Sequence, residues 1–144
     1  MANTNYYKTH VEPYVRLELE RRHGVRFHSQ ILALTTVGTH EFDAVAEDRS
    51  IVASIKSLSA KTASGKRPAA KYQNCVAELY YLSLIEAPRR ILVLTTPDWH
   101  TMFMRYIDGR LAPGLEIELI HLPPELQAEV DKLRDAASEE VSPT

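Results

Sequence analysis

The sequence predicts an α/β domain whose mixed central β-sheet is flanked by helices. One observation is a hairpin pattern, in which two β-branched runs at 40–47 and 51–57 are joined by a short polar turn. A second is the continuous apolar run at 90–96, which is typical of a strand buried on both faces. A sheet that begins with an antiparallel hairpin and ends with strand–helix–strand contains both kinds of strand pairing.

The remaining elements follow from hydrophobic periodicity and turn residues. Apolar side chains at Val11, Val15 and Leu19 predict a helix that begins near Glu12 and stops at Gly24. The other predicted elements are a first strand at 25–36, a helix at 72–87, a helix at 99–107, a strand at 115–122 and a last charged helix to about residue 137.

Composition places the chain among ordinary globular domains. Its 144 residues are 44% hydrophobic and 25% charged. We expect one domain over residues 1–137, with little fixed structure in residues 1–10, and a flexible acidic tail over residues 138–144. No apolar run approaches the roughly 20 residues of a membrane helix, so we expect no membrane contact. The single cysteine, Cys75, favours a reducing compartment and therefore a cytoplasmic protein.

Charge is unevenly distributed along the chain. The net charge is −2, but the stretch from Glu125 onward carries −4, so residues 1–124 carry +2. A basic segment at 58–71 contains no acid and four cations, Lys61, Lys66, Arg67 and Lys71. This segment is predicted to be a surface loop. It is either a solvated connection or a contact for the phosphate backbone of a nucleic acid.

The predicted hairpin carries an acid and a lysine. Asp43 falls on its first strand and Lys56 on its second, both near the open end of the hairpin. Simple alternation along the first strand puts Asp43 on one face and Phe42, Ala44 and Ala46 on the other. A carboxylate here can hold Mg²⁺, and a lysine can orient a water molecule and offset phosphoryl charge.

Other common chemistries find no support in the sequence. The six histidines show no metal-ligand spacing, and there is no P-loop, no dinucleotide-binding glycine pattern and no nucleophile elbow. We therefore expect no zinc site, no nucleotide cofactor and no serine hydrolase.

The hairpin and the order of elements resemble the PD-(D/E)xK nuclease superfamily, which includes type II restriction enzymes and Holliday-junction resolvases. The resemblance covers about residues 11–122. Asp43 matches the motif aspartate and Lys56 the motif lysine. Glu12 matches a metal-binding glutamate of the first helix, and Gln73 falls where related enzymes carry a glutamine near the lysine. The resemblance implies a restriction-endonuclease-like α-β-β-β-α-β core with an added C-terminal helix.

The sequence departs from the family motif at Ser54, which stands where the second acid is expected. Three interpretations remain open. The acid has migrated to the next helix, with Glu78 as the first candidate and Glu12 as the second. Alternatively, one metal held by Asp43 and Glu12 is enough. In the third interpretation the site is inactive, and the domain only binds nucleic acid or a partner protein.

The resemblance implies a metal-dependent endonuclease that hydrolyses DNA phosphodiester bonds with Mg²⁺ (or Mn²⁺). A chain of this size needs a second copy to cut both strands of a duplex, so we expect a homodimer that binds DNA. The alternative is a catalytically inactive nuclease-fold module. The implied catalytic residues are Asp43, Lys56, Glu78, Glu12, Ser54 and Gln73, and the implied metal ligands are Asp43, Glu12 and Glu78.

Overall fold

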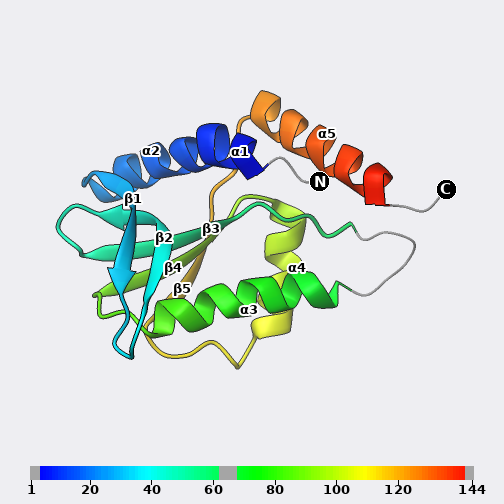
Figure 1. The fold of residues 1–144 in the computed structure, drawn as a ribbon. Coiled ribbons are helices and arrows are strands. Elements are labelled where there is room, and N and C mark those ends of the chain that lie inside the picture. The colour runs from blue at the N-terminus through cyan, green and yellow to red at the C-terminus, as the bar shows by residue number, and fades with distance from the viewer. Residues whose placement is uncertain (1–3, 62–67, 142–144) are drawn as a thin grey trace.

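The structure, a computed structural model, describes residues 4–61 and 68–141 of the chain. A five-stranded sheet lies between two layers of helices (Figure 1). From β1 to β3 the strands pair antiparallel, and from β3 to β5 they pair parallel, so the predicted mixed sheet is confirmed. The strands lie side by side in chain order: β1 (Phe27–Ala33), β2 (Thr39–Ala46), β3 (Ile51–Lys56), β4 (Arg89–Leu94) and β5 (Leu115–Leu119).

The helices divide between the two faces of the sheet. The helix α3 (Ala69–Ser83) connects β3 to β4, and α4 (Pro97–Ile107) connects β4 to β5. Both connections step the same way across the sheet, so right-handed crossovers place both helices on one face. The opposite face is covered by α2 (Glu12–His23) and α5 (Pro124–Val141) (Figure 1). Among the described residues, no helix is long and apolar enough to cross a membrane.

Both ends of the chain are more helical than predicted. A first turn, α1 (Thr4–Tyr6), and a wider π-helical segment, η1 (Tyr7–Val11), lead directly into α2. The expectation of little structure at the N-terminus is therefore wrong for the part that is described. At the other end α5 continues to Val141, well into the segment predicted to be a flexible tail.

The hydrophobic core lies in two layers, one on each side of the sheet. Val11, Val15 and Leu19 are at most 1% exposed and pack on the α2 face, as their spacing predicts. Gly24 ends α2 with a φ of 72°, which favours glycine, and its N–H donates to the Glu20 carbonyl at 2.8 Å.

A β-bulge interrupts β2 beside Asp43. His28 of β1 pairs with Val45, and Gln30 pairs with Phe42, so one residue of β1 faces two residues of β2. The bulge breaks the alternation of side chains along β2, and it does so next to the residue that the sequence singles out as a candidate ligand.

The consequence is visible in the packing. Phe42 and Val45 both pack on the face covered by α3 and α4, whereas Ala44 and Ala46 pack on the α2 face. The prediction that Phe42 shares a face with Ala44 and Ala46 is therefore wrong. The bulge supplies the physical reason, because it shifts the alternation by one residue.

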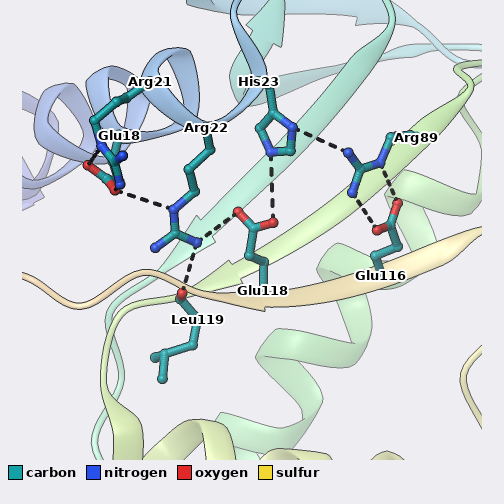
Figure 2. Close-up of polar contacts among 8 residues, drawn as sticks. All are labelled: Glu18, Arg21, Arg22, His23, Arg89, Glu116, Glu118 and Leu119. Atoms are coloured by element: carbon teal, nitrogen blue, oxygen red, sulfur yellow. Dashed lines mark hydrogen bonds and ion pairs between the residues drawn. The ribbon is translucent and has the colours of Figure 1, made fainter.

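Charged side chains tie the C-terminal end of α2 to the parallel edge of the sheet (Figure 2). Arg89 of β4 binds Glu116 of β5 through two hydrogen bonds of 3.0 and 2.7 Å. The same guanidinium donates through Nη1 to His23 Nδ1 at 3.3 Å, and His23 Nε2 lies 3.8 Å from Glu118 Oε1.

The neighbouring residue of α2 adds a second tie. Arg22 Nη1 donates to the Leu119 carbonyl at 3.3 Å and lies 3.4 Å from Glu118 Oε2 (Figure 2). On the helix itself, Glu18 accepts hydrogen bonds from Arg21 and Arg22. These contacts fix the axis of α2 against the sheet, and this helix presents Glu12 at its other end.

Candidate active site

Asp43 lies where β2 and β3 begin to separate. The two strands pair at Ala44 opposite Ala53 and at the next residue pair toward the turn. On the other side of that pair, Asp43 Oδ2 accepts a hydrogen bond of 2.7 Å from the backbone N–H of Ile55. The carboxylate therefore takes the place of a strand partner for a buried backbone donor.

The charge of Asp43 is held in a half-buried position. Burial raises the pKa of its carboxyl, whereas the hydrogen bond from Ile55 lowers it. The negative charge of Glu78 raises this pKa further, and the positive charge of Lys56 lowers it. The structure thus brings Asp43, Lys56 and Glu78 within electrostatic range of one another, although they come from three different elements.

Glu12, at the start of α2, joins the same group. Its side chain is 17% exposed. Burial, followed by the negative charge of Asp43, raises its pKa to about 7. Arg16 stands between the two acids: its Nη1 lies 3.8 Å from Glu12 Oε1 and donates to the Asp43 carbonyl at 2.9 Å. Arg16 therefore anchors the bulged backbone and partly offsets the negative charge.

Glu78 projects from α3 toward the end of β3. Its Oε1 lies 3.7 Å from Lys56 Nζ, and its Oε2 lies 3.5 Å from His40 Nε2. The His40 ring stacks on Tyr81 with centroids 3.8 Å apart, which fixes the imidazole beside the carboxylate. The side chain of Glu78 is only 18% exposed, so these contacts hold it in a partly desolvated position.

A cavity of about 420 Å³ opens beside these residues. Glu12 and Lys56 line it, together with Lys8 from η1 and Asn74 from α3. Lys8 Nζ also lies 3.6 Å from Glu41 Oε1 at the exposed rim. The cavity therefore presents two lysines and an amide near a set of half-buried carboxylates, an arrangement suited to a phosphate group beside a cation.

Two predicted residues lie elsewhere. Ser54 is completely buried, and its hydroxyl has no hydrogen-bond partner within residues 4–61 and 68–141. Its side chain does not line the cavity. Gln73 is exposed and borders a separate depression with Tyr72 and Tyr106. The adjacent residue, Asn74, is the one that faces the cavity, because it lies four positions before Glu78 on the same side of α3.

The basic segment is described only in part. Lys66 and Arg67 lie outside the described residues. Lys61 is exposed, whereas Lys71 Nζ donates to the Ser59 carbonyl at 2.6 Å and to the Lys61 carbonyl at 2.5 Å. Burial lowers the pKa of Lys71. Lys71 therefore braces the chain that follows β3, and Lys61 is the described lysine of this segment that faces solvent.

The donors at this site suit a hard divalent cation, although the set of three predicted ligands is not assembled. In the part of the chain that is described, no three His, Cys, Asp or Glu side chains are arranged to hold a metal. Glu12 and Asp43 are neighbouring half-buried carboxylates, and a divalent cation would relieve their repulsion. Glu78 is held by Lys56 and His40. Glu12 and Asp43 therefore fit the metal, and Glu78 lies within electrostatic range of Asp43.

Sequence reasoning missed four residues of this site: Lys8, Arg16, His40 and Asn74. Their signals were weak, because each reaches the site through tertiary packing and not through a motif. Arg16 was the easiest of them to predict, since it follows Glu12 by one helical turn and must lie on the same side of α2.

Comparison with protein-family models, with curated proteins and with solved structures gives no match to this chain.

Proposed function

We propose that the chain is a metal-dependent endonuclease with a restriction-endonuclease-like core, which hydrolyses phosphodiester bonds of DNA. The observation that carries this proposal is the convergence of Glu12, Asp43, Lys56 and Glu78 beside one cavity. The first helix, two strands of the hairpin and the following helix each contribute to this group. The order of elements supports the same proposal, since a helix, three antiparallel strands, a helix and a parallel strand follow one another.

In this proposal each side chain has a distinct task. Glu12 and Asp43 hold Mg²⁺ (or Mn²⁺), which supplies charge neutralisation and an acidified water when bound. Lys56 orients the attacking water and faces the phosphate, and Lys8 and Asn74 bind the flanking phosphate oxygens. Glu78 keeps Lys56 in place and is a further carboxylate within electrostatic range of Asp43. Ser54 takes no part, because its side chain is buried away from the cavity.

The test is nicking of supercoiled plasmid by purified protein with Mg²⁺, Mn²⁺ or EDTA. We expect metal-dependent nicking by the wild type and loss of at least about 100-fold in rate for both Asp43→Asn and Lys56→Met. Glu86→Gln is the matched control, because Glu86 is exposed just beyond α3. Equal trace product from wild type and Asp43→Asn would refute the enzyme. Linearisation of plasmid with second-order dependence on protein concentration would support the proposed homodimer.

A second candidate is an inactive nuclease-fold module that binds DNA. The observation that favours it is the absence, within the described residues, of any three ligands arranged for a metal. It predicts salt-dependent DNA binding that Mn²⁺ does not strengthen and that Asp43→Asn does not weaken. The proposed nuclease predicts the opposite result for both comparisons, so the two candidates separate in one binding experiment.

A further inference from the structure

A second and larger cavity, of about 620 Å³, lies at the carboxyl ends of the parallel strands. Thr96 follows β4, His121 follows β5, and Ser59 and Lys61 follow β3. The wall is one side of α5, with residues at helical spacing: Gln127, Asp131, Arg134 and Asp135. The carboxyl ends of parallel strands are where open α/β sheets usually bind ligands. The residues of the candidate active site do not contribute to this cavity.

Three polar atoms among the lining residues have no hydrogen-bond partner in the described part of the chain. They are Thr96 Oγ1, Gln127 Oε1 and Arg134 Nη2. Thr96 is 9% exposed, and although it precedes α4 its hydroxyl does not cap that helix. Buried polar atoms without partners are costly, so binding of a ligand that pairs with them is favoured. These atoms are closed off from solvent in the structure, so the side chains around them must turn toward the cavity when the ligand binds.

The two residues of α5 that carry unpaired atoms share one carboxylate. Gln127 Nε2 donates to Asp131 Oδ1 at 3.0 Å, and Arg134 Nη1 donates to the same oxygen at 3.1 Å. Two atoms on these neighbouring groups remain unpaired within the described residues. They are the amide oxygen of Gln127, which is an acceptor, and Nη2 of Arg134, which is a donor. A complementary ligand must offer a donor and an acceptor on one edge.

The charges around the cavity argue against a simple ion. Asp98, Asp131 and Asp135 line it together with the cations Lys61 and Arg134. A free anion would satisfy Arg134 but would meet the aspartates, and a free cation would meet the guanidinium. A neutral ring with an amide-like edge satisfies both unpaired atoms. The volume lies within the roughly 300–1,000 Å³ of small-molecule sites, and Pro97 and His121 offer flat surfaces for a ring.

We propose that this cavity binds a nucleobase, which pairs its donor–acceptor edge with Gln127 and Arg134 and reaches the hydroxyl of Thr96. The base comes either from a free nucleoside or from a nucleic-acid strand. The strand source rests on the proposed function: Ser57 and Leu58 line the candidate active site, and Ser59 lines this cavity, so one short segment separates the two. A nucleotide beside a phosphate bound at Lys56 would lie near the second cavity.

Calorimetric titration of the full chain with adenosine, with purine riboside and with ribose 5-phosphate tests the base recognition. Purine riboside lacks the exocyclic donor, and the sugar phosphate lacks the base. We expect adenosine to bind at least about fivefold more tightly than purine riboside. Thr96→Val and Gln127→Met should each lower the affinity for adenosine by a similar factor. Gln30→Met, an exposed change on β1, should bind like the wild type. Equal affinity for ribose 5-phosphate, or no effect of Gln127→Met, would overturn the proposal.

A second arm separates the two sources of the base. Binding of a single-stranded oligonucleotide is compared with that of the same strand carrying one abasic position. If the base comes from a strand, Gln127→Met lowers the affinity for the intact strand. The intact and abasic strands then bind with the same affinity. If it comes from a free nucleoside, adenosine binding depends on Gln127 and strand binding does not. Adenosine binding by wild type and by Asp43→Asn, without plasmid nicking by either, would refute the nuclease and leave the nucleobase site standing.

Discussion

The ammonium group of Lys56 lies 3.7 Å from Glu78 Oε1, so the end of β3 and the middle of α3 meet in an ion pair at the candidate active site. The two residues are 27% and 18% exposed in their side chains, which makes this pair less solvated than an ordinary surface ion pair. It also brings a carboxylate close to Asp43 from outside the hairpin, where the migrated-acid interpretation of Ser54 requires one.

The first prediction concerns this carboxylate. If Glu78 serves the metal or orients Lys56, Glu78→Gln should reduce Mn²⁺-dependent nicking by about 100-fold, as much as Asp43→Asn, because each change removes a carboxylate that binds the cation or holds Lys56 in place. The measurement is the initial nicking rate at saturating Mn²⁺, followed by a titration of the metal. If the variant needs more Mn²⁺ for half-maximal activity, Glu78 is a ligand of the cation. If the Mn²⁺ concentration is unchanged and only the rate falls, Glu78 acts by orienting Lys56. Activity equal to that of Glu86→Gln would remove Glu78 from the site.

The second prediction concerns Ser54, which is completely buried with its hydroxyl unpaired among the described residues. Ser54→Ala should leave the free energy of unfolding unchanged or raise it by about 1 kcal/mol, because it removes an unsatisfied polar group. Ser54→Glu should lower it by several kcal/mol, because it buries a charge without a partner. Urea denaturation measures both.

Ser59→Ala is the matched control for Ser54. Ser59 is 3% exposed, and its hydroxyl accepts a hydrogen bond of 3.0 Å from the Lys61 N–H. Its replacement should therefore destabilise the fold by about 1 kcal/mol. A Ser54→Glu protein as stable as the wild type would show that position 54 opens toward the cavity and could carry the acid that the family motif expects.

Much of the fold could be predicted because its signals are local. The structure confirms the buried spacing of Val11, Val15 and Leu19 and the end of the helix at Gly24. It also confirms the predicted order of strands and helices. The bulge beside Asp43 could not be predicted, since it depends on how β1 and β2 pair and no glycine or proline marks it. If side-chain alternation is counted across the bulge, the residues beyond it are assigned to the wrong face of the sheet.

The candidate site was predictable in part for the same reason. Asp43 and Lys56 belong to one hairpin, so their proximity follows from a short turn. Glu78 joins them through the packing of α3. It contacts His40, whose ring stacks on Tyr81, and no sequence pattern predicts these contacts. The second cavity is still less visible in the sequence, because its lining comes from the ends of three strands and from one side of α5.

The third prediction separates two lysines of the basic segment. Lys61 is exposed and free to contact a phosphate backbone, whereas Lys71 is bonded to the carbonyls of Ser59 and Lys61. Lys61→Met should lower DNA affinity and reduce the slope of log affinity against log salt by about one. Lys71→Met should leave that slope unchanged but lower the free energy of unfolding by about 1–2 kcal/mol, because two carbonyls lose a charged donor. Fluorescence anisotropy over a salt series and urea denaturation give the two readouts. The reverse assignment would mean that Lys71 leaves its carbonyls to bind DNA.

The fourth prediction concerns Glu12, whose pKa is raised from 4.5 to about 7 by burial and then by the charge of Asp43. The folded state therefore holds this proton more tightly than the unfolded state. The free energy of unfolding should fall as pH rises from about 4.5 to about 7, by on the order of 3 kcal/mol, and this contribution should be constant at higher pH. Asp43 contributes with the same sign, since burial raises its pKa too.

Glu12→Gln isolates the contribution of Glu12. The variant should match the wild type near pH 4, where both side chains are neutral, and should be more stable than the wild type at pH 8. Glu129→Gln on the exposed side of α5 should show no such pH-dependent difference. If Glu12 and Asp43 together hold a cation, Mn²⁺ at pH 8 should raise the melting temperature of the wild type and not that of Glu12→Gln, because only the wild type keeps two like charges for the cation to neutralise. A stability difference that is constant from pH 4 to pH 8 would mean that Glu12 ionises as freely in the folded chain as in water, and the repulsion that favours a metal would be absent.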